Sequence, residues 1–292
     1  MTTLVIGGTG NVGGAVVREL LARGLPVRVL TRSAEKSAAL PEGATAAIGD
    51  MASPASLGPA FAGAERAFLM TPLDQNETEL GLAAVAAATA ARVGRLVYMS
   101  VHRVDSAPHI PIFANKIPVE RAIRGSKIPY TIVRPNQFMQ MDLLVLDAMR
   151  KGVYPTPIGD VGLSPVDVRD IAAVVVKALT EDGHAGMTYA LVGPDVLTGR
   201  GTAEVWSRHL GRQVRYAGND LDAWEGMVRA MLPGWLIHDL RIMYEHFQRH
   251  GLAAGPDELA AMRRVLGREP RRLDGLAREV SANARAGTQA NG

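Results

Sequence analysis

Apolar runs of about five residues alternate with amphipathic segments along the first two thirds of the chain. A run that begins at Thr3 leads directly into glycines, and after them apolar residues recur at helical spacing from Val12 to Leu20. Gly24 ends this segment, and Pro26–Thr31 follows as a second apolar run. The pattern predicts a strand, a helix and a second strand, which is the start of a βαβ unit.

The same alternation continues towards residue 192. Further strands are predicted at Ala44–Ile48, Arg66–Met70, Arg95–Ser100, Tyr130–Arg134 and Thr188–Val192. Further helices are predicted near Ser53–Phe61, Asn76–Val93 and Val168–Thr180. Strands that alternate with helices predict an α/β fold with a Rossmann-type, doubly wound parallel sheet, and the segments after Thr198 predict a smaller, mainly helical C-terminal part.

Glycines fill the turn between the first strand and the first helix. Gly8, Gly10 and Gly13 fit G-x-G-x-x-G, and Gly7, Gly10 and Gly13 also fit G-x-x-G-x-x-G. Such a turn lets the backbone approach a pyrophosphate, whose charge then faces the unpaired N–H groups at the positive end of the helix. The alternative is an ordinary tight turn of an unrelated α/β domain, which the second strand makes less favourable. The predicted contacts are Gly7, Thr9, Gly10, Asn11, Val12 and Gly13.

The end of the second strand indicates which dinucleotide binds. An NAD site usually carries Asp or Glu there for the ribose 2′-hydroxyl, whereas this chain has Thr31-Arg32-Ser33, and Glu35 lies too far past the strand to replace that acid. Arg32 suits a 2′-phosphate, and Ser33 and Lys36 add a hydrogen bond and a charge. The sequence therefore predicts NADP(H) as the cofactor. The alternative is that Arg32 and Lys36 are solvated surface charges.

Other cofactor contacts are expected at the carboxyl ends of the remaining strands. Asp50, after the third strand, is placed to accept a hydrogen bond from an adenine amino group, although a plain turn residue is an equally open interpretation. The predicted contacts at these ends are Asp50, Met51, Thr71, Pro72, Ser100, Val101, Pro135, Asn136 and Phe138.

The chain is predicted to divide into two parts. Residues 1–135 form the dinucleotide-binding half, and residues 136–281 form a substrate-binding part from which residues 166–192 return to the sheet. Residues 282–292 are small and polar without an apolar period, so a disordered tail is expected there. The alanine-rich segment Leu80–Ala91 is either core packing or a subunit contact, so a homodimer stays open.

Composition excludes several classes of function. The 292 residues are 47% hydrophobic and 21% charged, without an apolar stretch long enough to span a membrane or to act as a signal peptide, so a cytoplasmic protein without a membrane partner is expected. Zero cysteines exclude disulfides, thiolate metal ligands and a cysteine nucleophile, and no metal site is predicted. The net charge of +3 and basic clusters such as Arg263–Arg264, which lack interleaved aromatics, indicate a solvated helix face and not a nucleic-acid site.

Several motifs together carry a resemblance to a known family. They are Gly7-Gly8-Thr9-Gly10-Asn11-Val12-Gly13, Thr31-Arg32, Gly49-Asp50, Tyr98-Met99-Ser100, Asn115–Glu120, Pro129–Met139 and Val166–Ala172. With these motifs, most of the chain resembles the NmrA-like group of atypical short-chain dehydrogenases, which includes quinone reductases and triphenylmethane reductases. The resemblance implies the fold and the cofactor. It says less about substrate, because relatives range from reductases to regulators that bind the dinucleotide without turnover.

The resemblance also implies that Lys116 lies beside the nicotinamide ribose, where ordinary short-chain dehydrogenases pair a lysine with a tyrosine four residues earlier. In this chain that earlier position is Ile112, which cannot donate a proton. Reduction of a ketone develops an alkoxide that needs a nearby acid, so simple alcohol dehydrogenase chemistry is not expected. The predicted catalytic residues are Lys116, Ser100 and His102, with His102 as a candidate proton donor.

A substrate pocket is expected between the carboxyl edge of the sheet and the C-terminal part. Methionine and aromatic side chains would suit a planar apolar molecule; the alternative is that their helical spacing simply marks core positions. The predicted lining residues are His102, Phe138, Met139, Met141, Trp224, Met227, Met231 and Trp235, with Met243 as a further candidate.

These observations predict an NADPH-dependent oxidoreductase that transfers hydride to an apolar conjugated acceptor without the usual tyrosine. A quinone gives a phenolate of pKa about 10, and a cationic dye or an iminium needs no strong acid, so both tolerate the loss. The alternatives are a non-catalytic NAD(P) sensor that acts through a protein partner, and a specialised biosynthetic reductase or isomerase.

Overall fold

The chain folds into two compact units. The computed structural model describes residues 1–33, 35, 37 and 40–290. The first unit comprises Met1–Pro135 and Val168–Ala190, and the second comprises Asn136–Asp167 and Leu191–Gly292. The candidate lysine, the glycine turn and nearly all of the predicted strand ends belong to the first unit.

A seven-stranded sheet forms the centre of the first unit, in the order β3-β2-β1-β4-β5-β6-β8. Strands β1 to β6 pair in parallel. Strand β8 continues the same direction, because the hydrogen bonds Ile132 N to Met187 O and Asn136 N to Leu191 O advance together along β6 and β8. The strands are β1 (Thr3–Val5), β2 (Val27–Thr31), β3 (Ala44–Ile48), β4 (Arg66–Leu69), β5 (Arg95–Met99), β6 (Tyr130–Pro135) and β8 (Thr188–Leu191). The Rossmann-type sheet predicted from the sequence is confirmed.

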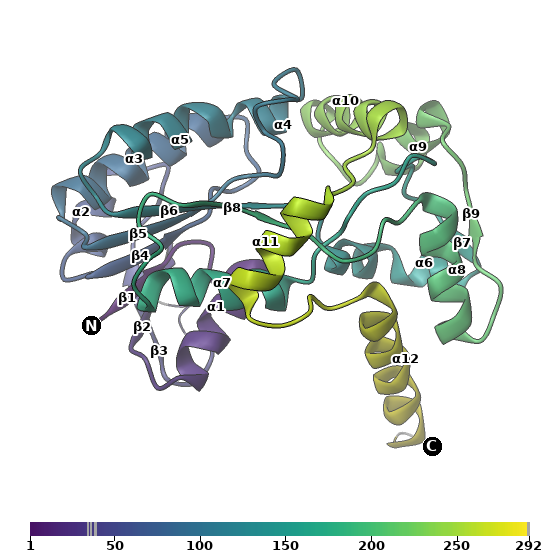
Figure 1. Ribbon diagram of the computed structural model, residues 1–292, viewed down its shortest axis with the longest axis horizontal. Coiled ribbons are helices and arrows are strands. Elements are labelled where there is room, and N and C mark those ends of the chain that lie inside the picture. The colour runs from purple at the N-terminus through teal and green to yellow at the C-terminus, as the bar shows by residue number, and fades with distance from the viewer. Residues whose placement is uncertain (34, 36, 38–39, 291–292) are drawn as a thin grey trace. The chain divides into compact units, whose positions relative to one another are not determined.

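Helices cover both faces of this sheet. In Figure 1, α2, α3 and α5 lie over one face, while α1 and α7 lie side by side over the other. The first face is filled by aliphatic and aromatic side chains that alternate along the strands, as expected for parallel strands buried on both sides. The helices are α1 (Asn11–Ala22), α2 (Pro54–Phe61), α3 (Glu77–Ala90), α4 (Pro111–Ala114), α5 (Lys116–Gly125) and α7 (Val168–Thr180).

Alanine-rich α3 packs closely against α5, so the packing interpretation of this segment holds. The tightest approach is at Gly81, where a Cβ would lie 2.5 Å from a methyl of Val119 and 3.0 Å from a methyl of Thr71. Small side chains thus set the distance between the two helices. One turn before this contact, α3 begins at Glu77 and α5 begins at Lys116.

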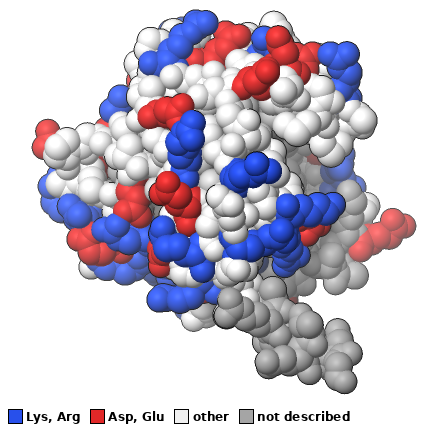
Figure 2. Space-filling model, turned by 90° about the vertical axis from the view of Figure 1, so that its right-hand side faces the viewer, with Lys and Arg blue, Asp and Glu red and all other residues white. Residues whose placement is uncertain are grey.

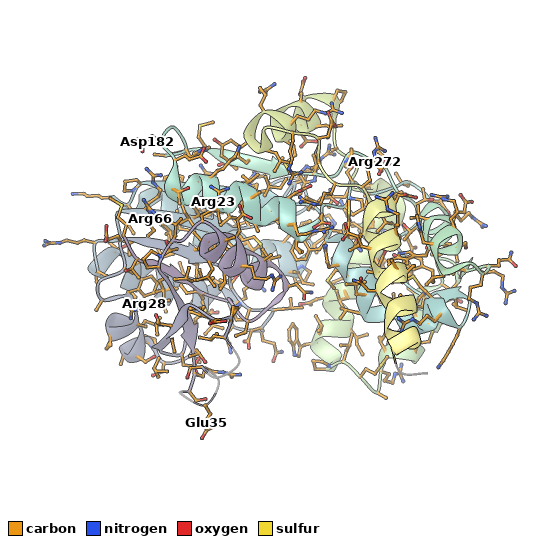
Figure 3. All side chains as sticks on the ribbon, turned by 90° about the horizontal axis from the view of Figure 1, so that it is seen from below. Arg23, Arg28, Glu35, Arg66, Asp182 and Arg272 are labelled. Atoms are coloured by element: carbon orange, nitrogen blue, oxygen red, sulfur yellow. The ribbon has the colours of Figure 1, made fainter. Side chains whose placement is uncertain are left out.

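The amino edge of the sheet carries ion pairs that hold its elements together. Arg23, at the end of α1, lies 2.9 Å from Glu19 and 3.7 Å from Glu181, and Arg95 pairs with Asp182 at 2.8 Å. Figure 3 shows Arg23 and Asp182 at this end of the first unit. The charges here join neighbouring elements, so the edge left for a ligand is the carboxyl edge.

The second unit is mainly helical. It contains the 3₁₀ helix η2 (Met139–Val145), the helices α6 (Leu146–Arg150), α8 (Gly199–Leu210), α9 (Leu221–Val228), α10 (Gly234–His250), α11 (Pro256–Leu266) and α12 (Leu273–Ala290), and the two-residue strands β7 (Val153–Tyr154) and β9 (Arg215–Tyr216). Side chains cap two of these helices: Thr198 accepts from Gly201 N, and Asp220 accepts from Asp222 N and Ala223 N.

One sequence expectation changes in this unit. Helix α12 extends to Ala290, where a disordered tail was expected from residue 282; a helix can keep its backbone hydrogen bonds without an apolar period. Residues 291–292 lie outside the described part of the chain. No helix in the described residues is long and apolar enough to cross a membrane.

Replacing Gly81 with alanine tests the close contact between α3 and α5. The added methyl must displace the β-branched Val119, so we expect the free energy of unfolding to fall by about 1–3 kcal/mol. Urea titration measures this change. Gly226→Ala on α9, where a Cβ has no neighbour within 4 Å, is the control and should be neutral or stabilising through helix propensity. Equal stability of the two variants would show that the contact is loose.

Candidate functional site

The glycine turn after β1 contains glycines that the fold itself requires and one that it does not. Gly7 has φ +80°, and a Cβ at Gly13 would lie 2.1 Å from the carbonyl oxygen of Gly7. Gly10 differs, because its φ is −89° and its nearest neighbours would be 3.5 Å and 3.7 Å from a Cβ. Contacts within the protein therefore do not explain the glycine at position 10. A pyrophosphate that lies close to the backbone of the turn would explain it.

The start of α1 is prepared for an anion. Gly10 is its N-cap, without a side-chain hydrogen bond, and its first turn holds no acidic residue. The N–H groups of that turn and the positive end of the helix dipole are therefore not compensated by a carboxylate of the helix. Thr9 and Asn11 are exposed beside the turn, whereas the Val12 side chain is buried, so only the backbone of Val12 is available to a ligand.

At the end of β2, a basic residue is exposed to solvent next to a buried threonine. Thr31 is buried and its hydroxyl donates to the carbonyl of Ser33 at 3.3 Å, while Arg32 is exposed. Glu35 is exposed as well, and its side chain points away from the first unit in Figure 3. Lys36 lies outside the described residues. Arg32 thus stands at the position where an NAD site usually has its acid.

Polar groups in the turn after β3 form hydrogen bonds with one another. Asp50 Oδ1 accepts from Ala52 N at 3.0 Å, and Ser56 Oγ bonds both the N–H and the carbonyl of Asp50. Met51 belongs to the core cluster. The turn interpretation therefore describes these two residues well, and an adenine contact through Asp50 stays a prediction.

A buried ion pair joins the ends of β4, α3 and α5. Lys116 Nζ lies 2.5 Å from Glu77 Oε1 and 3.4 Å from Thr71 Oγ1, and the Thr71 hydroxyl donates to the same Glu77 oxygen at 2.5 Å. The Glu77 side chain is 1% exposed and that of Lys116 is 12% exposed. Glu77 was not among the residues predicted from the sequence. An acid in the first turn of a helix is so common that no pattern distinguished it.

Two further predicted catalytic residues lie at the end of β5. Ser100 is buried, and its hydroxyl oxygen has no hydrogen-bond partner among the residues that the structure describes. His102 is only 2% exposed. Its backbone N–H donates to Pro135 O at 2.9 Å, which joins the ends of β5 and β6. That burial agrees better with a structural histidine than with a proton donor to substrate. Pro72 is exposed and Val101 is half-buried.

An arginine on β6 holds α5 in place. Arg134 donates to both carboxylate oxygens of Glu120, at 2.9 and 2.7 Å, and to Asp105 at 2.6 Å. Although burial favours the neutral acid, these bonds hold the pKa of Glu120 below its usual range. Because Glu120 and Lys116 both lie on α5, the bidentate contact from Arg134 also fixes the helix that carries Lys116.

Two predicted cofactor contacts fall in the second unit. Asn136 is buried, its amide donates to Leu252 O at 2.7 Å, and its Oδ1 accepts from Gln137 N. Phe138 is half-buried and bridges to Val166. Both residues belong to the second unit, and their contact with the cofactor stays a prediction.

The predicted lining residues of the second unit separate by exposure. Met139 and Trp224 are buried, and Trp224 packs edge to face on Tyr244 with ring centroids 5.1 Å apart, so the core alternative describes both. Met141, Met227 and Met231 are exposed large apolar residues. Trp235 and Met243 are half-buried. Exposure keeps the three methionines as candidates for contact with an apolar molecule.

A buried carboxylate lies inside the second unit. Asp142 Oδ1 accepts from the Tyr154 hydroxyl at 3.0 Å, and Oδ2 accepts from the Trp206 indole at 2.8 Å. Burial raises the pKa of Asp142 to about 6, because the two neutral donors only partly replace the lost hydration. Asp142 and Tyr154 line a small cavity that Phe138 and Met139 also line.

Several arginines of the second unit pair with acids. Arg263 lies 2.8 Å from Glu269, Arg208 lies 3.4 Å from Asp274, and Arg272 pairs with Asp195. On the face shown in Figure 2, Lys and Arg side chains are interspersed with Asp and Glu. The solvated helix face expected at Arg263–Arg264 stays a prediction.

The chain is similar to several known proteins. A model of the NmrA-like family matches residues 1–274. An NAD(P)H azoreductase of Xenophilus azovorans is 34% identical over 264 residues, 89% of each chain. A (4-alkanoyl-5-oxo-2,5-dihydrofuran-3-yl)methyl phosphate reductase of Streptomyces griseus is 36% identical over 233 residues, 79% of this chain and 81% of the relative. The structure of an NADPH-dependent quinone oxidoreductase of Escherichia coli, complexed with NADPH, has a TM-score of 0.84 at 24% identity, covering 95% of this chain and 99% of that one.

The raised pKa of Asp142 predicts that stability falls as the pH rises from about 4 to about 6. The neutral acid is favoured in the fold, so its stabilisation is complete below pH 3.8 and disappears as the pH rises through about 6, a total of about 3 kcal/mol. Asp142→Asn imitates the neutral acid and should remove this dependence, as measured by urea unfolding between pH 4 and pH 8. Asp147→Asn, at an exposed neighbouring acid, is the control. An unchanged pH dependence in Asp142→Asn would contradict the assignment.

Proposed function

Because the chain belongs to the NmrA-like family, we propose that it is an NADPH-dependent reductase of an apolar, conjugated acceptor. The observation that carries the proposal is Gly10, a glycine that the fold does not need, at an α1 N-terminus without acids. Both features fit a pyrophosphate that approaches the backbone closely.

The cofactor would be held along the carboxyl edge of the first unit. The turn from Gly7 to Gly13 would hold the pyrophosphate, and the exposed Arg32, with Ser33, would hold a 2′-phosphate. Thr71, Ser100 and Lys116 lie at the ends of β4 and β5 and at the start of α5, where they would face the nicotinamide side. When bound, NADPH supplies the hydride, and these residues orient it.

The reaction needs little acid from the protein. Hydride transfer adds one proton and two electrons to the acceptor. A neutral acceptor becomes an anion, which one further proton converts to the product. A cationic acceptor becomes neutral directly. The Lys116 ammonium is the charge best placed to stabilise such an anion, and water can deliver the proton. Ile112, on α4, offers no donor. We infer that the enzyme works without the tyrosine of ordinary short-chain dehydrogenases.

The acceptor class follows from this chemistry and from the relatives. The azoreductase and the dihydrofuranyl phosphate reductase are both named for reduction of an unsaturated, electron-poor group. A conjugated acceptor delocalises the charge that it gains, so it tolerates the lack of a strong acid. The exposed methionines Met141, Met227 and Met231 are the proposed apolar contacts for such a flat molecule.

Turnover is tested by NADPH oxidation at 340 nm against azo dyes, quinones, triarylmethane dyes and cyclic imines, with NADPH binding measured by calorimetry in parallel. We expect binding together with oxidation by at least one conjugated acceptor, and none by simple ketones. Tight binding without turnover on any acceptor would contradict the reductase and favour a dinucleotide sensor. Absence of binding would refute the cofactor as well.

Arg32→Ala tests the choice of dinucleotide. Removal of a charge-assisted hydrogen bond costs about 1.5–3 kcal/mol, so NADPH binding should weaken at least about tenfold while NADH binding stays the same. Titration calorimetry with both cofactors gives the ratio. Arg121→Ala, which removes an exposed arginine from α5, is the charge-matched control. Equal losses for NADPH and NADH in Arg32→Ala would remove the 2′-phosphate assignment.

A further inference from the structure

We propose that Glu77 is a positioning residue that fixes the Lys116 ammonium at the carboxyl edge. The inference rests on the proposed reductase function for its catalytic consequence, but the contact itself is independent of turnover. Glu77 lies beneath the site, 1% exposed, and acts through Lys116 without reaching a ligand.

The contact is short and shared. Glu77 Oε1 receives two donors, the Lys116 ammonium and the Thr71 hydroxyl, each at 2.5 Å. Thr71 follows β4, Glu77 begins α3 and Lys116 begins α5, so a single oxygen joins three elements, of which α5 lies 39 residues along the chain from Glu77. The lysine side chain therefore has one fixed position instead of the many rotamers of a solvated lysine.

Lys116 stands where its charge is unfavourable without such a partner. It is the first residue of α5, at the positive end of the helix dipole, and the first turn of α5 contains no acid. The N-terminus of α3 also lies beside it, because Gly81 and Val119 bring the two helices together one turn further on. Two positive helix ends and an ammonium would repel one another, and Glu77 is the carboxylate that compensates them.

The surrounding groups leave this task to Glu77. From β5, the phenol of Tyr98 is fully buried, and burial followed by the charge of Glu77 raises its pKa, so it stays neutral. From α5 itself, Glu120 is occupied by Arg134 and Arg124. Thr71 carries no charge. The Lys116 ammonium therefore depends on Glu77 for its counter-charge.

The pair is poorly explained by stability alone. In the described part of the chain, Glu77 Oε2 and the Tyr98 hydroxyl are buried without a hydrogen-bond partner. Each such group costs free energy of desolvation, and a buried ion pair is often no more stable than an apolar replacement. An arrangement that costs stability yet holds a lysine at a ligand-binding edge points to a role in positioning that lysine.

Glu77→Gln tests the proposal, because glutamine keeps the shape and the Oε1 acceptor but removes the charge. Glu79→Gln, at an exposed acid in the same turn of α3, is the matched control. We expect Glu77→Gln to lower kcat about tenfold or more, with NADPH affinity changed less than about threefold. If Glu77→Gln lost only stability and kept the kcat of Glu79→Gln, the proposal would be overturned.

A double-mutant cycle separates positioning from a structural role. If Glu77 acts through the lysine, Glu77→Gln should cost little further kcat in a Lys116→Met background. Additive losses would show that Glu77 acts independently of Lys116 and would overturn the proposal. Glu77→Asp, which restores the charge at shorter reach, should recover part of the lost kcat.

A readout without turnover distinguishes failure of this inference from failure of the proposed function. The chain has five lysines, Lys36, Lys116, Lys127, Lys151 and Lys177, so ¹³C-methylated Lys116 can be followed by NMR and assigned with Lys116→Arg. Its methyl resonance should sharpen in Glu77→Gln, because the released side chain gains rotamers, and should stay unchanged in Glu79→Gln. An unchanged linewidth in Glu77→Gln overturns the inference. A sharpened resonance in a protein that reduces no acceptor refutes the reductase and leaves Glu77 as the group that fixes the position of Lys116.

Discussion

The parallel order of the sheet is the constraint on which the rest of this structure depends. When every strand runs in one direction, the helices that follow the strands begin at one edge, and their positive ends collect there. The α1, α2 and α5 helices contain no acid in the first turn, so they leave that edge electropositive. Acids stand in the first turn of α3, at Glu77 and Glu79, and of α7, at Asp170. An electropositive edge attracts a dinucleotide and repels a lysine, and the contact with Glu77 offsets that repulsion.

Much of the first unit could be predicted from the sequence because its signals are local. The strands at Ala44–Ile48 and Thr188–Leu191 and the helix at Val168–Thr180 stand in the structure where their apolar periods predicted them. The sequence could not predict that the fold itself requires Gly7 and Gly13 but not Gly10. That difference depends on which atoms lie near the position of each missing Cβ.

The groups that the sequence missed have partners far along the chain. Glu77 meets a lysine 39 residues away, and Asp142 receives a hydrogen bond from Trp206, 64 residues away. Neither carboxylate differs in its local pattern from an ordinary surface acid. The two-residue strands β7 and β9 were missed for a related reason, because a strand so short has no period to detect.

Three buried carboxylates in this chain show how the partner, and not burial alone, decides what an acid can do. Glu120 has a bidentate arginine, which holds its pKa low and makes it a permanent charge that fastens α5. Asp142 has only neutral donors, so its pKa rises to about 6 and its charge depends on the pH of the surroundings. Glu77 has a lysine, held by a short contact at the start of α5. We propose that this lysine also meets the charge of a ligand, so that the pair belongs to the site while the other two acids belong to the scaffold.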